Sequence, residues 1–558
     1  MTASTLPLRT GGHLLVDQLL VQKVDTVFCV PGESYLEVLD GLYDARDRIR
    51  LINARHEAGA ANMAEAYGKL TGRPGICMVT RGPGACHAAV GVHTAFQDST
   101  PMILLIGQVG REFADREAFQ EIDYRAMFAP VAKWVAQIEV TARIPEYLAR
   151  AFTVATQGRP GPVVLALPED MLREAAQVPD APRSRPIRGG VPAVELDELR
   201  DRLVAAERPM VLVGGSGWSD AACRHIQSFC ESNGLPVACS FRRQDIFDNN
   251  SASFAGDLGT SGPPALVKRM KQADLLVVVG ARLGEMTTQG YTIMDPPVAG
   301  RSLVHIHADS GELGRVYAPD LAINTGVNAF AEAVADARWI SADRYKAWRE
   351  NARADYLAYM EPNTPPGPVD LPEVMRQLQP FLQGDYVLTL DAGNHTGWPQ
   401  RFLSYARPGR QIGPTSGAMG YSVPAAVAAS LVRPDALVIG CVGDGGFMMS
   451  GQEIATAVQH GGRPIVLVFN NGMYGTIRMH QERHHPGRVI GTDLTSPDFV
   501  AYGKALGAHS ERVTSTEEFL PAFERARASG KAAVIDIEAD PELVSTRFTL
   551  SSLGVVAN

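Results

Sequence analysis

Short apolar runs recur along the chain, and each is followed by a glycine- or proline-containing turn and then by a helix-like pattern. An apolar run of this length between turn signals is typical of a buried strand. Strands that alternate with helices predict a parallel sheet covered on both faces. The predicted strands fall into three blocks: 26–30, 50–53, 75–80, 102–106 and 163–167, then 209–213, 275–279 and 302–306, then 386–390, 436–441, 465–470 and 533–537.

Two proline-rich stretches separate these blocks. Residues 177–191 combine Pro, Arg and Gly, and residues 360–372 carry five prolines, a composition typical of linkers. A chain of 558 residues is also too long for one core. We therefore expect an α/β protein with three doubly wound parallel-sheet domains, at residues 1–175, 192–345 and 370–545. The pattern after Asp540 predicts no element.

Composition narrows the possible partners. The net charge of −9 argues against a nucleic-acid-binding surface and gives no support for binding to an anionic membrane. No apolar stretch approaches the length of a membrane span, and the N-terminus lacks the apolar core of a signal peptide. Seven cysteines without a Cys-x-x-Cys pair argue against a disulfide framework or a zinc site. A cytoplasmic enzyme is the resulting expectation.

The third block contains the strongest candidate chemistry. Gly443-Asp444-Gly445-Gly446 follows one predicted strand and Asn470-Asn471 ends the next. Carboxylate and carboxamide oxygens suit Mg²⁺ or Ca²⁺, and glycine amides can approach a phosphate. These segments predict a divalent metal bridged to a diphosphate, the alternative being an Asx turn and a loop asparagine. Gly393-Asn394-His395, after the strand 386–390, could add a phosphate contact or form a plain loop.

Three further segments have both a functional and a structural interpretation. Residues 413–424 form a small-residue loop whose one large apolar side chain, Met419, could belong to the core or support a cofactor ring. Glu57 begins an Ala- and Gly-rich helix, where a carboxylate can simply complement the helix dipole. The tight turn 80–85 could expose backbone amides, and Gln120 lies in a loop, where a surface amide is equally common.

Together these segments resemble the thiamine-diphosphate-dependent enzyme family, and within it the large catalytic subunits of the acetolactate synthase type. The resemblance covers nearly the whole chain. The segments that carry it are HisGluAlaGlyAla at 56–60, GlyProGlyAla at 82–85, GlyArgProGlyProVal at 158–163, SerGlyAlaMetGly at 416–420 and GlyAspGlyGlyPheMetMet at 443–449, together with Asn470-Asn471. It implies a pyrimidine-binding first domain, a central domain and a diphosphate-binding third domain.

The resemblance also implies the role of each site residue. Mg²⁺ would be held by the side chains of Asp444 and Asn471 and by the backbone oxygen of Met473. Glu57 would bond N1′ of the aminopyrimidine and favour the tautomer that takes the proton from the thiazolium C2. The other residues implied to contact the cofactor are Pro83, Asn394, His395, Gly417, Met419, Gly443, Gly445, Gly446 and Tyr474. The pyrimidine-binding domain of one subunit would face the diphosphate-binding domain of another, in a homodimer or homotetramer.

Substrate choice depends on other positions. Phe119 and Gln120 match the active-site loop of the acetolactate synthase type, and we assign Gln120 a catalytic role beside Glu57. Three positions depart from that pattern: Glu169 stands where the family has lysine, Met286 where it has a carboxylate-binding arginine, and His480 where it has tryptophan. Since a histidine can donate to a substrate carboxylate or carbonyl, His480 is the third predicted catalytic residue, with a surface position as the alternative.

The predicted function is therefore thiamine-diphosphate- and Mg²⁺-dependent cleavage or formation of a C–C bond next to a carbonyl, by an acetolactate-synthase-like carboligase or a decarboxylase acting on a 2-ketoacid. One alternative is a lyase of the 2-hydroxyacyl-CoA or oxalyl-CoA decarboxylase type. Another is a flavoenzyme of the pyruvate oxidase type. The family's Gly-Met-His-Gly pattern for FAD is absent, and residues 256–263 read GlyAspLeuGlyThrSerGlyPro, so FAD is not expected.

Overall fold

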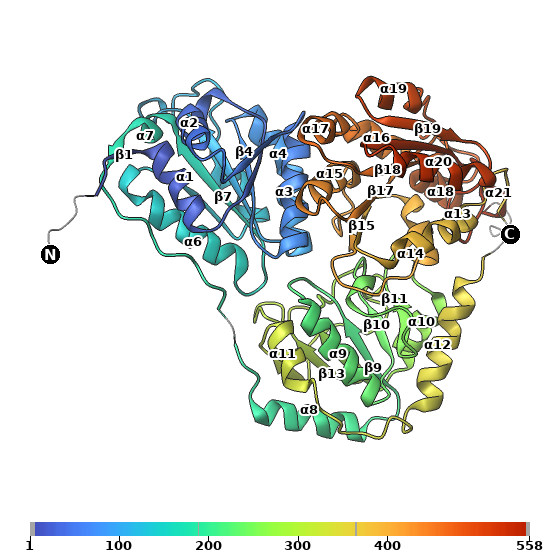
Figure 1. Cartoon of the computed structure of the whole chain (residues 1–558). Helices are drawn as coiled ribbons and strands as arrows, with labels where there is room; N and C mark the ends of the chain where they lie inside the picture. The colour runs from blue at the N-terminus through green and yellow to red at the C-terminus, as the bar shows by residue number, and fades with distance from the viewer. Residues whose placement is uncertain (1–5, 188, 363–364, 554–558) are drawn as a thin grey trace. The chain divides into compact units, whose positions relative to one another are not determined.

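The computed structural model of the chain describes residues 6–187, 189–362 and 365–553. These residues contain three six-stranded sheets, and all neighbouring strands within each sheet run parallel (Figure 1). A two-stranded antiparallel pair, β1 (Arg9–Thr10) with β8 (Ala175–Ala176), is the remaining sheet of the described residues. The predicted α/β class with three doubly wound parallel sheets is confirmed.

The first sheet has the strand order β3-β2-β4-β5-β7-β6. Its strands are β2 (Thr26–Cys29), β3 (Arg50–Asn53), β4 (Gly75–Val79), β5 (Met102–Gln108), β6 (Trp134–Gln137) and β7 (Pro162–Pro168). Its helices are α1 (Gly11–Val21), α2 (Leu36–Asp44), α3 (Glu57–Thr71), α4 (Pro83–Asp98), α5 (Tyr124–Phe128), α6 (Ile144–Thr156) and α7 (Glu169–Arg173).

Side chains alternate between the two faces of this sheet. Ile103 and Leu105 of β5 join a core formed with α1, α2 and α6. The opposite face is covered by the alanine-rich helices α3 and α4, which pack closely against each other. A Cβ on Gly91 of α4 would lie 2.5 Å from the Cβ of Ala61 in α3, so the close packing of the two helices requires glycine at that point.

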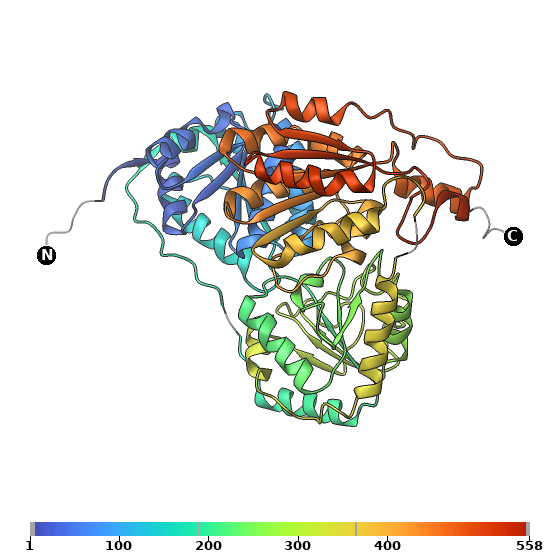
Figure 2. The same cartoon turned by 45° about the vertical axis from the view of Figure 1, so that its right-hand side comes forward.

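The central sheet has the order β11-β10-β9-β12-β13-β14. Its strands are β9 (Pro209–Val213), β10 (Val237–Cys239), β11 (Phe254–Asp257), β12 (Leu275–Val279), β13 (Ser302–Ile306) and β14 (Leu321–Ile323). Val211 and Val213 face a core with α8 (Ala193–Ala205), α9 (Asp220–Ser232) and α11 (Val327–Val334). Met210 and Leu212 face the opposite core, with α10 (Pro264–Gln272) and α12 (Lys346–Met360). Figure 2 shows the yellow helix α12 beside the green central sheet.

The third sheet has the order β16-β15-β17-β18-β20-β19, which repeats the order of the first sheet when strands are counted from each sheet's own start. Its strands are β15 (Tyr386–Leu390), β16 (Gln411–Ile412), β17 (Leu437–Gly443), β18 (Ile465–Asn470), β19 (His509–Val513) and β20 (Ala533–Glu538). The remaining helices are α13 (Leu371–Leu378), α14 (Gly397–Phe402), α15 (Ser422–Val432), α16 (Asp444–Ser450), α17 (Glu453–His460), α18 (Gly475–His484), α19 (Phe499–Ala505), α20 (Thr516–Ala528) and α21 (Leu550–Leu553).

The chain folds into two compact units. The first contains the described residues up to 187 together with 423–434 and 450–463, so α15 beyond Ser422 and all of α17 belong to the same unit as the first sheet. The second contains the central and third sheets. The predicted division at 175, 192, 345 and 370 stays a prediction, and α12 lies beyond its central range.

Two further properties agree with the composition. All seven cysteines are free thiols, six of them buried. Among the described residues, no helix is both long enough and apolar enough to span a membrane.

Candidate functional site

The order of the third sheet reverses between β15 and β17, and a crevice opens there beyond the carboxyl ends of the strands. Open parallel sheets bind ligands at such a reversal. A cavity of about 250 Å³ lies at this place, formed by the loops after β15, β17 and β18. Eleven of the predicted site residues line it: Asn394, His395, Gly417, Met419, Gly443, Asp444, Gly445, Gly446, Asn471, Met473 and Tyr474. Their roles toward a ligand remain predictions.

Asp444 is the first residue of α16 and is buried. Its Oδ1 accepts the backbone N–H of Gly445 at 2.8 Å, and its Oδ2 accepts that of Gly472 at 2.8 Å. Burial raises the pKa of this carboxyl, and the backbone hydrogen bonds act in the opposite direction. Asn471 and Met473, the other two predicted metal ligands, line the same cavity. This set of hard oxygen donors fits Mg²⁺.

The wall formed by residues 443–446 has little room for side chains. A Cβ on Gly445 would lie 2.6 Å from the ring of Tyr474, and one on Gly446 would lie 3.1 Å from Asp391 Oδ1. A Cβ on Gly443 would lie 3.0 Å from Nδ1 of His395. A side chain at Gly445 would therefore clash, and one at Gly443 or Gly446 would force a neighbouring side chain to shift. The three glycines leave bare backbone that a phosphate group can approach.

One ring nitrogen of His395, Nε2, is buried without a protein partner. Its ring hydrogen-bonds to the Cys441 backbone, while Nε2 is buried and makes no hydrogen bond. Burial lowers the pKa of His395 to about 3, so the ring is neutral at pH 7 when nothing occupies the cavity. An unsatisfied buried nitrogen in a cavity wall is expected where a ligand supplies the missing partner. The residues present therefore fit a diphosphate with its metal.

The loop that carries Met419 is held by Asp391. This fully buried carboxylate accepts backbone N–H groups from Ala392 at 2.7 Å, Gly420 at 2.9 Å and Ser422 at 3.0 Å. Burial raises the pKa of Asp391 to about 6. Met419 itself is 36% exposed and lines the cavity, so it is not a core methionine.

The C-terminal tail contributes residues for which the sequence pattern predicted no role. Leu543 and Val544 line the cavity, and the Val544 carbonyl accepts the side-chain N–H of Asn394 at 2.6 Å. Val544 also packs with Met479 and Leu553 in a small apolar cluster. The adjacent apolar pair Leu543-Val544, in a tail of mixed polar and apolar residues, was the available signal.

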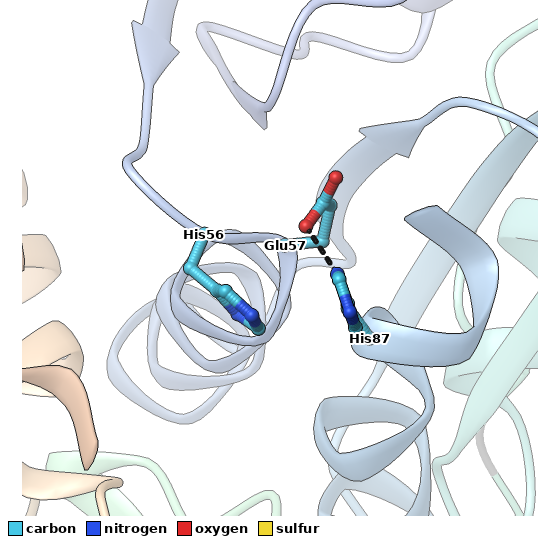
Figure 3. Close-up of side chains that lie close together, drawn as sticks. All are labelled: His56, Glu57 and His87. Carbon is cyan, nitrogen blue, oxygen red and sulfur yellow. Dashed lines mark hydrogen bonds and ion pairs between the residues drawn. The ribbon is translucent and has the colours of Figure 1, made fainter. Parts of the chain in front are cut away.

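Glu57 lies in the other compact unit, as the first residue of α3. His56 caps this helix, with its Nδ1 accepting the N–H of Ala58 at 3.1 Å. Figure 3 shows Oε2 of Glu57 directed at His87, whose Nδ1 is 2.9 Å away. One ligand atom from each of His56, Glu57 and His87 lies within 4.8 Å of the others, so this trio has metal-ligand spacing. His87, one turn into α4, was not predicted.

Glu453, at the start of α17, fixes the backbone just before Glu57. Its carboxylate accepts the N–H of Arg55 at 3.1 Å and that of His56 at 3.0 Å, as well as the hydroxyl of Thr456 at 2.6 Å. The side chain is fully buried, and burial raises its pKa. A Cβ on Gly59 would lie 2.3 Å from Glu453 Oε1, so glycine in α3 makes this close approach possible.

Of the remaining predicted residues, Pro83 and Gln120 lie close together in the first unit. Pro83 begins α4, and the adjacent Gly82 is packed against Gln120: a Cβ on Gly82 would lie 2.8 Å from the Cβ of Gln120. Gln120 has a left-handed φ of +66°, so its loop is held in an uncommon conformation.

His480 is exposed on α18, with its ring 6.2 Å from that of His484, and it is not among the residues that line the cavity. Glu169 pairs with Arg81 at 3.3 Å, and Met286 is 37% exposed. The structure therefore does not bring these three residues, which are the candidates for substrate selection, to the cavity wall.

Comparison with known proteins finds one family model for each of the three large sheets. Three family models of thiamine pyrophosphate enzymes match in order: the N-terminal TPP binding domain at residues 9–127, the central domain at 196–334 and the C-terminal TPP binding domain at 391–537. The acetolactate synthase large subunit of Corynebacterium glutamicum is 31% identical, over 94% of this chain and 86% of that protein. The isozyme 2 large subunit of Escherichia coli is 30% identical, over 91% of each chain. A probable acetolactate synthase large subunit of Methanocaldococcus jannaschii is 29% identical, over 95% of this chain and 92% of that protein.

Proposed function

Since this chain belongs to the thiamine pyrophosphate enzyme family, we propose that it is a thiamine-diphosphate- and Mg²⁺-dependent carboligase of the acetolactate synthase type, acting on a 2-ketoacid. The observation that supports this most is the cavity at the end of the third sheet. It combines hard oxygen ligands, a wall of bare glycine backbone and the unpartnered Nε2 of His395. Magnesium as the metal belongs to this proposal, as does a cytoplasmic location.

Asp444, Asn471 and the backbone oxygen of Met473 would hold the metal, and Gly445, Gly446 and His395 would contact the diphosphate. The bound cofactor would supply a nucleophilic carbon and a positively charged ring able to accept the electrons released by C–C cleavage. Met419 would support the ring system from the loop that Asp391 fixes. Glu57 would hold and move the proton at N1′ of the aminopyrimidine, as general acid and base.

Substrate selection is proposed to depend on positions outside this pocket. Gln120 and His480 are the two further catalytic candidates. Met286 cannot form the bidentate contact to a second ketoacid's carboxylate that an arginine would make. We therefore propose a 2-ketoacid donor with an acceptor that need not present a carboxylate to residue 286.

A substrate panel tests this proposal. Purified protein loaded with thiamine diphosphate and Mg²⁺ is given single 2-ketoacids, pairs of a 2-ketoacid with an aldehyde or second ketoacid, and 2-hydroxyacyl thioesters, and products are identified by mass. The expected result is loss of CO₂ from a 2-ketoacid together with a ligated 2-hydroxyketone. Turnover of thioesters alone would instead favour the lyase alternative, and a flavin bound to the purified protein with O₂ consumption would favour the oxidase.

We also propose that the working form is a homodimer or homotetramer, in which Glu57 of one subunit serves the cofactor held by Asp444 of another. Under this arrangement a monomer is inactive.

A further inference from the structure

His87 forms the one side-chain hydrogen bond to Glu57 that the described residues contain. It lies on α4, one turn beyond the Gly82–Gly84 turn, and points toward the first turn of α3 (Figure 3). Its Nδ1 is 2.9 Å from Glu57 Oε2, and its ring stacks on that of His56 with centroids 4.5 Å apart. The stacked ring and the hydrogen bond together fix the orientation of the imidazole.

The direction of this hydrogen bond follows from the chemistry of the two groups. An ionised carboxylate has only acceptors, so Nδ1 of His87 donates to Oε2. The other ring nitrogen, Nε2, is then free to accept a proton. The side chain of His87 is half exposed, whereas that of Glu57 is only 14% exposed. In the single chain, His87 therefore lies between this shielded carboxylate and solvent.

The second carboxylate oxygen faces another direction. Oε1 of Glu57 lies 3.6 Å from the point where a Cβ on Gly84 would stand, and the absent side chain leaves this oxygen accessible from the turn. One carboxylate thus has an oxygen directed at His87 and an oxygen directed at the glycine turn. A carboxyl group with two oxygens in different contacts can accept a proton on one and release a proton from the other.

The proposed reaction requires such a connection. When two 2-ketoacid anions combine and one CO₂ leaves, two negative charges become one, so one proton must enter the site from solvent in each turnover. Glu57 is the proposed acid and base beside the cofactor, yet its side chain is largely shielded. A group that carries the proton from solvent to this carboxylate is therefore needed if the proposed function holds.

We propose that His87 is a positioning and proton-relay residue that carries protons between solvent and the Glu57 carboxyl group. With Glu57 ionised, a hydronium ion gives a proton to Nε2 and Nδ1 passes its proton to Oε2, so the carboxyl group becomes neutral and the ring keeps its proton on Nε2. The carboxyl group then releases a proton into the site and is ionised again. The ring returns to its starting tautomer by exchange with water, which removes the proton from Nε2 and supplies one to Nδ1, so one proton has moved from solvent to the site in each cycle.

A metal ion is a poorer explanation of the same trio. His56 uses Nδ1 to accept the N–H of Ala58, so its other nitrogen carries the proton in the neutral ring and has no lone pair for a metal. Binding a metal at that nitrogen would break the cap of α3. The hydrogen-bonded arrangement satisfies the groups without an ion.

The test measures hydrogen–deuterium exchange at C2 of bound thiamine diphosphate, by rapid mixing of the loaded protein into D₂O, acid quench and NMR. Four variants are compared with the unaltered protein: Glu57→Gln, His87→Asn, His87→Ala and, as a matched control, His93→Asn, which changes an exposed histidine of the same helix. Asparagine can keep the hydrogen bond to Oε2 but cannot relay a proton. This readout needs no substrate, so it is independent of which 2-ketoacid the enzyme uses.

We expect His87→Asn and His87→Ala each to slow exchange about tenfold, with His93→Asn unchanged. This is less than the roughly 100-fold or larger loss typical of a group that reacts directly, because His87 acts through Glu57. Added imidazole should restore exchange in His87→Ala because the half-exposed position leaves space for it. Wild-type exchange in His87→Asn would overturn the relay and leave His87 with a positioning role only. If Glu57→Gln exchanges at the wild-type rate, the proposed role of Glu57 fails, which is a different outcome from failure of the relay.

Discussion

At the scale of single residues, the buried carboxylates are satisfied by backbone N–H groups. Asp391 accepts three such groups and Asp444 accepts two in the hydrogen bonds described above. Only Asp444 also faces the cavity, because Asp391 directs its oxygens into the loop of Met419. A carboxylate that is both anchored and directed at open space is the one suited to hold a metal ion.

Replacement of Asp444 by alanine should abolish metal-dependent retention of thiamine diphosphate, because Mg²⁺ loses a charged ligand and Asn471 with a backbone oxygen cannot replace its charge. The measurement is the dissociation constant of the cofactor with Mg²⁺ and with a chelator. We expect wild-type affinity to depend on Mg²⁺ and the variant's to be weak in both conditions. Asp493→Ala, at an exposed carboxylate on a nearby loop, is the control. Unchanged affinity in Asp444→Ala would place the metal elsewhere.

The residues that sequence reasoning identified share one property: each lies in a short segment with a recognisable composition, such as Gly443–Gly446 or Asn470-Asn471. The structure brings eleven of them to one cavity. His87 and Val544 were missed because each acts through a contact with a distant part of the chain. No local pattern marks a histidine on a helix as the partner of a glutamate thirty residues earlier.

At the scale of elements, α17 holds the start of α3. Glu453 accepts two successive backbone N–H groups, of Arg55 and His56, directly before the first turn of the helix. A helix N-terminus has unpaired N–H groups that need acceptors. The placement of the start of α3, and with it of Glu57, therefore depends on a carboxylate from a segment far away in the sequence.

Replacement of Glu453 by glutamine should destabilise the first unit by about 1–3 kcal/mol, because one acceptor oxygen becomes a donor that faces a backbone N–H. We expect a lower thermal unfolding midpoint together with a lower kcat, since the backbone before Glu57 loses its anchor. Glu517→Gln, at an exposed glutamate in the first turn of α20, is the matched control and should change neither quantity. A variant that unfolds at the wild-type temperature with full activity would contradict this anchoring role.

The strands that were predicted from the sequence lie within two residues of those observed, as β9, β12, β13, β15 and β18 show, because buried parallel strands are continuous apolar runs. The edge strands β6, β11, β14, β16 and β19 and the three-residue strand β10 were not predicted. Two helices were also missed. The helix α12 has only two buried residues, so its sequence has a weak apolar stripe. The helix α13 begins with Leu371-Pro372 inside the predicted linker, where proline fits the first turn of a helix.

At the scale of the whole molecule, the first and third sheets share one strand order. The third sheet carries the proposed metal and diphosphate ligands, and the first carries the proposed acid. A common order was not detectable from the sequence, because no fixed period relates the two segments. In both, the functional side chains follow the carboxyl ends of strands, where parallel sheets place their ligands.

The proposed sharing of one active site by two subunits is testable by complementation. Glu57→Gln and Asp444→Ala, each inactive alone, are unfolded or dissociated, mixed in equal amounts and reassembled. Random pairing gives mixed dimers in half of the cases, and one of their two sites is intact, so activity should recover to about a quarter of wild type. No recovery, with mixed dimers verified by two different tags, would show that each chain supplies both residues to its own site.

Glu169, Met286 and His480 lie on three different segments, and none lines the cavity at the end of the third sheet. For protein engineering this separation has a practical value. Met286 and His480 are exposed, whereas Glu169 is partly buried and pairs with Arg81. Substitutions at positions that share no contacts usually act independently, so their effects on substrate preference can be measured one at a time and then combined. Libraries confined to these three positions would sample new acceptors while leaving cofactor affinity and the cores of all three sheets unaltered.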